Sequence, residues 1–432
     1  MRVSALPRFW AFIVPIVSVV VALLIASVII IMIGKSPIEA YTILLKGAFG
    51  SSSAIANTIV KTTPLILTGL AVGFGFRAGV FNIGAEGQMV MGALMATLVA
   101  INLGSVPPFI AITITLLVGM LAGAGWAAIA GYLKAKTGAH EVVTTIMLNW
   151  IATYLSSYMV QVPLAVGSGT PKSPEIAPST KLPELLTVGA INMNAGIIVS
   201  IIAAILLYII LEKTTMGYEV KAAGFNPYAA EYGGISLSKN ITMSMAISGA
   251  LAGLAGAIEL TGVHYRFLGT LSGGKGFDGI SIALIGQNNP IGIIFAALLM
   301  GALRTGSNEM QFAGIPKHIV MIIQGIVIFL VAADRIVRTS MIIMDKKERI
   351  AQETKRFVKR AVILSIIIIV SMFLSKEGLW SFLGKFGYYV GKVFWVIELV
   401  SLLSLMIVVA LYIISAVISL GMVYSRRKKV KS

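Results

Sequence analysis

The feature that most constrains this chain is a succession of long apolar segments separated by short polar ones. The first runs from Phe9 to Ile33 without a charged residue, which exceeds the about 20 residues that a helix needs to cross a bilayer. In the hydrocarbon only the chain itself can satisfy its backbone N–H and C=O groups, so spanning structures are helices or closed barrels. Because the apolar stretches are continuous and do not alternate, they predict helices.

The composition agrees with a membrane protein. Hydrophobic residues make up 57% of the 432 residues and charged residues only 12%, whereas a soluble domain carries about 25% charge. We expect an all-α integral membrane protein with about 10 to 12 transmembrane helices, several of them short or broken. The predicted spans are Phe9–Ile33, Thr62–Phe76, Gly87–Leu103, Phe109–Leu133, Val142–Leu164, Ala195–Leu211, Ile241–Ile258, Gly279–Gln287, Pro290–Leu303, His318–Ala333, Ala361–Leu374 and Leu399–Met422.

The formal charge of +17 is assigned to loops that face anionic lipid headgroups, and not to nucleic-acid binding. If the N-terminus is cytoplasmic and all twelve segments cross, most of the 34 Lys and Arg residues lie on the cytoplasmic side, as the positive-inside rule requires. We therefore expect a multi-pass protein of the cytoplasmic membrane with both termini inside. Gly279–Leu303 could instead form one kinked span, which would invert the predicted orientation of every later segment.

Three regions are expected. Residues 1–56 would hold a retained N-terminal helix and an external loop, residues 57–338 a permease-like core, and residues 339–432 a charged cytoplasmic segment with two further membrane helices. The polar connections are predicted at Lys35–Lys61, Ala165–Asn194, Thr214–Asn240, Thr261–Asp278 and Asp334–Arg360. The glycine- and proline-rich stretch Gly167–Pro174 lies outside in this arrangement and offers a surface for an external partner.

Several kinds of site are excluded. Cysteine is absent, and the three histidines show no metal-ligand spacing, so neither a metal nor a cofactor is expected. The only partial P-loop is Gly34–Ser36, but Ile29 replaces its first glycine, so this chain would not hydrolyse ATP itself. Two pairs of glycines four residues apart, Gly119 with Gly123 and Gly249 with Gly253, suit close helix packing, although a chain with 44 glycines contains such pairs by chance.

The segment Phe81–Gln88 (FNIGAEGQ) places Asn82, Glu86 and Gln88 between two apolar spans. An ionisable group there is costly to bury unless it is paired, hydrated or functional. One interpretation is a helix break that lines a solute path. The other, which we favour for Glu86, is structural, with Asn82 as the N-cap and Glu86 at the positive end of the helix dipole.

A short cytoplasmic helix is predicted between Leu211 and Ile241. Asn226-Pro227 is a helix-start signal and Gly233-Gly234 ends the helix. It is either a loop helix or a lever that docks into a partner and carries conformational change into the membrane.

Three segments carry a resemblance to a known family: Gly84–Gln88, Lys221–Ala230 (KAAGFNPYAA) and Gly276–Gly292. Together they resemble ABC-importer permeases of the branched-chain amino acid, ribose and nucleoside superfamily, over about two thirds of the chain, from Asn57 to Arg338. Phe81–Gln88 and the external loop from Thr170 to Pro183 look most like the nucleoside branch. The chain after Arg338 departs from the family, whose members typically end near that point.

The resemblance implies four partners: a second homologous permease, a cytoplasmic ABC ATPase, an external lipid-anchored substrate-binding protein and a nucleoside or other small polar solute. It also implies that the short helix is the coupling helix, formed with Glu219, Lys221, Gly224, Asn226, Pro227, Ala229, Ala230 and Glu231. Of these, Glu219, Lys221, Asn226 and Glu231 would lie nearest the ATPase. The residues considered for the translocation path are Asn82, Glu86, Gln88, Asn149, Trp150 and Asp278. Aromatic stacking suits a nucleobase, but for Trp150 we favour packing, because the external protein supplies specificity.

The resulting hypothesis is the permease subunit of an ATP-driven importer, expected to carry nucleosides by alternating access. The same machinery could carry a sugar or a branched-chain amino acid. A different class is an ion-coupled secondary transporter, in which Glu86, Glu259 or Asp278 would carry the coupling ion. A membrane-embedded enzyme is disfavoured because no catalytic constellation is visible.

Overall fold

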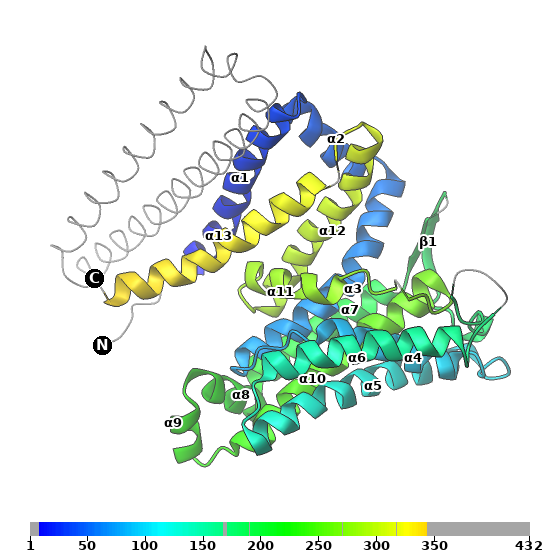
Figure 1. Cartoon of the computed structure of the whole chain (residues 1–432), viewed down its shortest axis with the longest axis vertical. Coiled ribbons are helices and arrows are strands. Elements are labelled where there is room, and N and C mark those ends of the chain that lie inside the picture. Colours follow the sequence, from blue (N-terminus) through cyan, green and yellow to red (C-terminus); the bar gives the residue numbers. More distant parts are fainter. Residues whose placement is uncertain (1–7, 167–170, 190, 270, 317, 344–432) are drawn as a thin grey trace, which may run out of the picture. The chain divides into compact units, whose positions relative to one another are not determined.

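The computed structural model describes residues 8–166, 171–189, 191–269, 271–316 and 318–343 (Figure 1). The predicted spans Ala361–Leu374 and Leu399–Met422, the basic tail and nearly all of the 339–432 extension lie outside these residues. The described helices are α1 (Arg8–Met32), α2 (Pro37–Phe49), α3 (Ser52–Arg77), α4 (Ala85–Ala100), α5 (Pro108–Thr137), α6 (Glu141–Gln161), α7 (Gly196–Lys213), α8 (Thr215–Phe225), α9 (Pro227–Tyr232), α10 (Leu237–Glu259), α11 (Lys275–Ile285), α12 (Pro290–Phe312) and α13 (His318–Ile343).

The chain divides into two compact units. Ser36–Val320, here called the core unit, holds α2 to α12, while α1 and nearly all of α13 belong to the other unit. Two predicted spans belong wholly or largely to this other unit. Phe9–Ile33 agrees with the bounds of α1, and His318–Ala333 agrees with the start of α13. The remaining sections concern the core unit.

Five described helices are long and apolar enough to cross a membrane, and a sixth span results if α1 and α2 are one broken segment. They are α3, α5, α7, α10 with the turn that follows it, and α12. The expected helical, multi-pass architecture is therefore confirmed, while the total of about 10 to 12 spans stays a prediction. The short apolar helix α4 fits the expectation of spans below full length.

The polar connections contain more regular structure than predicted. Lys35–Lys61 holds α2 and the first turns of α3, because Ser36 and Ser51 each cap a helix start with a side-chain oxygen. Residues 165–194 contain an antiparallel hairpin of β1 (Glu184–Val188) and β2 (Ile191–Asn194). The all-α prediction was therefore wrong for this segment, since a solvated connection can satisfy its backbone by cross-strand pairing.

The short helix predicted after Asn226 is confirmed as α9. The Asn226 side-chain oxygen accepts a hydrogen bond from the N–H of Ala229 (3.1 Å), and Pro227 takes the first helical position. α8 precedes it directly and ends at the same asparagine. The chain thus makes a helical pair between α7 and α10.

Glycines bring α4, α5 and α10 into backbone contact, and Figure 1 shows these helices running side by side. Gly253 of α10 contacts Gly119 and Gly123 of α5 and Gly92 of α4, and Gly249 contacts Gly123. Both glycine pairs singled out from their spacing therefore lie in one interface, as small residues do where membrane helices approach closely.

This interface gives a test within one helix. A Cβ on Gly123 would overlap the backbone of Gly249 and Gly253, whereas one on Gly125, two residues along α5, would meet nothing within 4 Å. We expect Gly123→Ala to lower stability by about 1–3 kcal/mol through overpacking. Gly125→Ala should be neutral or stabilising, by up to about 1 kcal/mol, because alanine favours a helix. Thermal unfolding of the purified protein in detergent measures both. Equal stability of the two variants would contradict the observed packing.

Candidate functional site: helix starts and charged residues of the core unit

Two helices begin at neighbouring positions in the core unit. The Glu86 carboxylate, in the first turn of α4, accepts hydrogen bonds from the N–H groups of Gly274 (3.1 Å) and Gly276 (2.8 Å) at the start of α11. The approach is close, since a Cβ on Gly276 would overlap the Glu86 backbone. One carboxylate therefore lies at the positive ends of two helix dipoles and satisfies backbone donors that have no partner within their own helix.

Two buried amides join the turn before α4 to the helix itself. Asn82 and Gln88 are each 1% exposed and exchange reciprocal hydrogen bonds of 2.8 and 2.9 Å. The Asn82 amide nitrogen also donates to the Ser248 hydroxyl of α10 (2.8 Å), which in turn donates to the Ala71 carbonyl of α3 (2.6 Å). This network links α3, α4 and α10 through side chains that bond to one another.

Asn82 is not the N-cap that the sequence suggested. Gly84 occupies the N-cap position. The Asn82 side-chain oxygen accepts a hydrogen bond from the Gly84 N–H at 2.9 Å, in the turn that precedes the helix. The physical reason is competition: the Asn82 side chain is used by Gln88 and Ser248, so it closes the turn before the helix.

Asn149 of α6 also bonds to the start of α4 and to the turn before it. Its side-chain oxygen accepts from the Gly87 N–H (2.8 Å), and its nitrogen donates to the Ile83 carbonyl (3.0 Å). Four of the six residues predicted for the path thus converge. We call Asn82, Glu86, Gln88, Asn149 and Ser248 the α4-start cluster.

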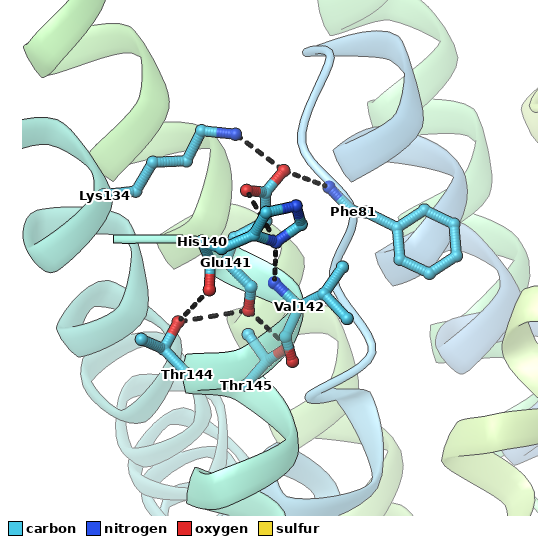
Figure 2. A network of polar contacts seen from close by, with 7 residues as sticks. All are labelled: Phe81, Lys134, His140, Glu141, Val142, Thr144 and Thr145. Carbon is cyan, nitrogen blue, oxygen red and sulfur yellow. Dashed lines mark hydrogen bonds and ion pairs between the residues drawn. The ribbon is translucent and has the colours of Figure 1, made fainter. Parts of the chain in front are cut away.

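An ion pair anchors the turn that carries this cluster (Figure 2). Glu141, the first residue of α6, contacts the Lys134 ammonium at 2.6 Å and accepts a hydrogen bond from the Phe81 N–H at 3.4 Å. In Figure 2 the Phe81 ring points away from the carboxylate, and it contacts Phe76 at 4.9 Å between centroids. The ends of α3 and α5 and the start of α6 are therefore joined at one point.

α8 packs against the same turn. A Cβ on Gly224 would overlap the Arg77 carbonyl, and one on Gly79 would come within 2.9 Å of the Gly224 Cα. Arg77 itself donates to the Asn288 carbonyl between α11 and α12 (2.9 Å). Backbone contacts therefore run from α8 to the end of α3, five residues before Asn82.

A second charged group surrounds the start of α11. The Lys275 ammonium contacts Glu259 at 3.0 Å, and His264 contacts the same carboxylate oxygen at 3.3 Å. Glu259 is 5% exposed and precedes a π-helical turn, Leu260–His264, a rare geometry that is frequent at functional sites. Asp278 pairs with Arg304 of α12. The carboxylates of Glu259 on α10 and Asp278 on α11 are thus compensated within the chain.

The segment after Pro171 lies along the chain that follows α10. Ser173 and Phe267 exchange two hydrogen bonds of 2.9 and 3.1 Å, and the Ile176 N–H donates to the Tyr265 carbonyl. At its exposed edge the Glu175 carboxylate contacts Lys181 and Arg266, and the hydrogen bond from Lys181 lowers the pKa of Glu175. The part of this predicted external loop around Ser173 and Ile176 therefore packs along the residues that follow α10.

The remaining two predicted path residues do not bond to the α4-start cluster. Asp278 faces Arg304. Trp150 is 60% exposed on α6 within this single chain, so our preference for packing at Trp150 stays a prediction. Sequence reasoning missed the cationic partners Lys275 and Arg304 and the hydroxyl of Ser248. Their side chains are ordinary in the sequence, and only the fold brings them to Glu259, Asp278 and Asn82. Among the described residues no group of three His, Cys, Asp or Glu side chains could hold a metal ion.

Comparison with known proteins decides the family. The family described as branched-chain amino acid transport system / permease component matches residues 54–332. The chain belongs to this permease family. The resemblance seen in the sequence is confirmed, and the protein is a multi-pass transport permease and not an enzyme.

Curated relatives extend this result. The permease is 38% identical to the guanosine ABC transporter permease protein NupP of Bacillus subtilis, over 79% of this chain and 98% of that protein. It is 36% identical to the nucleoside ABC transporter permease protein NupB of Lactococcus lactis, over 79% and 96%. A glucose ABC transporter permease protein of Haloferax volcanii, TsgB13, is 34% identical over 76% and 89%. No solved structure matches the permease.

The contacts of Glu86 lead to a stability prediction. Glu86→Gln keeps the shape but removes the charge and presents an NH₂ group to one of two N–H donors, so we expect a loss of about 2 kcal/mol, the scale of hydrogen bonds to charged groups. Glu39→Gln is the control, because Glu39 also lies in a first helical turn but is exposed. Thermal unfolding in detergent measures both, and equal shifts would contradict the double role of Glu86.

Proposed function

We propose that this permease is one subunit of an ABC importer that carries nucleosides across the cytoplasmic membrane by alternating access. The support for the cargo is the similarity to the guanosine and nucleoside permeases over nearly their whole length. The similarity to a glucose permease is weaker but extensive, so a sugar is the second candidate.

The proposed partners follow from paired relatives. The permease is similar to NupP and also, at 32% identity, to NupQ, a second guanosine permease protein of the same organism. NupB and NupC of Lactococcus lactis are likewise two nucleoside ABC transporter permease proteins of one organism. We infer a second homologous permease beside this one, a cytoplasmic ABC ATPase that hydrolyses ATP, and an external lipid-anchored substrate-binding protein.

The observation that carries the coupling proposal is the contact of α8 with the end of α3. We assign α9, with the end of α8, as the coupling helix, so that Glu219, Lys221, Asn226 and Glu231 lie nearest the ATPase. Phe225, Tyr228 and Tyr232 are more than four-fifths exposed there, and large exposed aromatic side chains are typical of partner-binding surfaces. Gly224 and Ala230, by contrast, face the permease itself.

A displacement of α8 would reach the α4-start cluster by direct contact. Gly224 meets Arg77 and Gly79, and the chain runs from there through Asn82 to the first turn of α4. Because Glu86 bonds to the start of α11, a shift of this turn moves two helix starts together. This is a contiguous mechanical route, and the two-state element that it biases is the pairing of α4 with α11.

The topology belongs to the same proposal. We keep about 10 to 12 spans, both termini in the cytoplasm and a core of residues 57–338, a boundary that the family match over residues 54–332 supports. We further propose that Asn82, Glu86, Gln88, Asn149 and Asp278 lie beside the solute route. Since their polar atoms bond within the chain, their proposed role is to position the helices that border that route.

Uptake measurements test the cargo. Cells that lack other nucleoside uptake, supplied with this permease and its partner subunits, should accumulate labelled guanosine, and unlabelled nucleosides should compete whereas glucose should not. Competition by glucose alone would favour the sugar alternative. Uptake by the purified chain alone, driven by a proton or sodium gradient in liposomes, would favour a secondary transporter and overturn the importer.

The coupling surface is tested by Ala229→Trp. Ala229 is exposed on α9, so the added ring should leave the permease folded but obstruct docking. A loss of about 1.4 kcal/mol in docking free energy lowers occupancy about tenfold, and uptake should fall on that scale at unchanged membrane levels. Ala165→Trp, an exposed alanine in the predicted external loop, is the matched control. Normal uptake with Ala229→Trp would exclude α9 as the docking surface.

A further inference from the structure

The outward face of α6 differs from that of its neighbours. α6 has 21 residues, enough to cross a bilayer, but it is not among the described helices that are apolar enough to pass as candidate spans. Its exposed side includes Trp150, Tyr154 and Tyr158, with exposed fractions of 60%, 68% and 56%. These residues follow one another at helical spacing, so they form one aromatic stripe.

α5 and α7 show what a lipid-facing helix of this core unit looks like. The exposed large side chains along the middle of α5 are aliphatic, for example Leu117 and Leu121, and those of α7 are Ile198, Ile201, Ile202, Ile205, Leu206 and Ile209. Aliphatic side chains match lipid tails and need no polar partner. The exposed side of α6 also carries aliphatic residues such as Val143, Ile151 and Leu155. Its aromatic stripe, however, has no counterpart among the exposed large side chains along the middle of α5 or on α7.

The stripe lies in the middle of α6. Trp150 is nine residues after Glu141, the first residue of the helix, so it lies about 13.5 Å along the helix at 1.5 Å per residue. In the proposed topology, in which α6 crosses the bilayer, this position is inside a hydrocarbon core of about 30 Å. One turn further, the Tyr154 hydroxyl has no hydrogen-bond partner among the residues that the structure describes. A phenol left in hydrocarbon costs free energy, whereas a polar solute or water satisfies it.

The stripe also has the shape of a stacking platform. The rings of Trp150 and Tyr154 are stacked, with centroids 6.0 Å apart and planes 26° apart. One turn beyond them, the Gln161 amide donates to the Ser157 hydroxyl at 2.8 Å. A flat π-surface is thus followed along the helix by hydrogen-bonding groups, the pattern that a planar base joined to a sugar requires.

We propose that this face of α6, formed by Trp150, Tyr154, Ser157, Tyr158 and Gln161, lines the solute route and that the base of a nucleoside stacks on Trp150 and Tyr154 during passage. The inference rests on the proposed function, which it deepens by naming the contacts. Stacking is tolerant of base identity, so the permease transmits nucleosides broadly and leaves the choice among them to the external protein.

The position of the stripe connects the solute to the moving parts. Asn149, the residue before Trp150, lies about 100° around the helix axis on the buried side of α6. It holds Gly87 and Ile83 at the start of α4. A shift of the α4 start therefore rotates or displaces the helix that carries the stacking pair. This supplies a physical reason for a weak, transient contact with the solute, since the same displacement releases it.

Cysteine accessibility tests the proposal directly, because the chain contains no cysteine. Tyr154→Cys and Ser157→Cys should react with a hydrophilic methanethiosulfonate reagent in the assembled transporter, and guanosine should slow the reaction. Leu121→Cys and Ile202→Cys, on the aliphatic faces of α5 and α7, are the controls and should react at least about tenfold more slowly, because a thiol in hydrocarbon stays protonated.

The outcomes separate this inference from the proposed function. Reaction at α6 no faster than at the two controls, or reaction that no nucleoside slows, overturns the inference even if the unaltered transporter accumulates nucleosides; the first result would place α6 against lipid or a protein partner. Failure of the proposed function shows instead as absence of nucleoside uptake by the unaltered transporter. Trp150→Phe should retain uptake that Trp150→Leu loses at equal membrane level, which a merely space-filling role would not produce.

Discussion

The structure of the core unit depends on satisfying helix starts that lie against other helices. The first N–H groups of a helix have no partner within it, and in an apolar surrounding each unpaired donor costs about 1–3 kcal/mol. Glu86 provides acceptors for the start of α11 while its charge lies at the start of α4. Short helices of this kind are stable inside a membrane protein only where such a carboxylate or amide is supplied, and the surrounding contacts follow from that need.

The polar residues around Glu86 fall into two groups, one neutral and one charged. Asn82, Gln88 and Ser248 bond to one another and to backbone, so they fix the turn at little electrostatic cost. Glu259 and Asp278 are charged and are offset by Lys275, His264 and Arg304. Because removing one partner of a buried pair leaves an uncompensated charge, these residues make the arrangement of α10, α11 and α12 specific as well as stable.

The sequence predicted features that depend on neighbours in the chain. The apolar runs, the cap at Asn226 and the four-residue glycine spacings are local patterns. Within the described residues, the helices, the cap and the glycine contacts appear where these patterns predicted them. Asn82 was predicted as an N-cap because the local pattern allows it, but its partner Ser248 is 166 residues away. The cationic partners of Glu259 and Asp278 were missed for the same reason. No local signal marks a lysine or arginine that the fold brings to a carboxylate.

The outward position of Trp150 on α6 could not be predicted for a different reason. A large aromatic residue is expected inside a soluble protein, but the inward stripe of α6 includes Thr145, Asn149, Ala152 and Ser156. These side chains are small or polar and allow close packing, and Asn149 bonds to the start of α4. In a bilayer the outside is as apolar as the inside, so residue size and polarity no longer separate the two faces. What separates them here is the demand for hydrogen bonds. A side chain that meets this demand within the fold turns inward, whereas the Tyr154 hydroxyl lies on the outward face, where the polar solute of our proposal or water would meet it. The outward polarity of a membrane helix is therefore more informative about transport than its buried polarity.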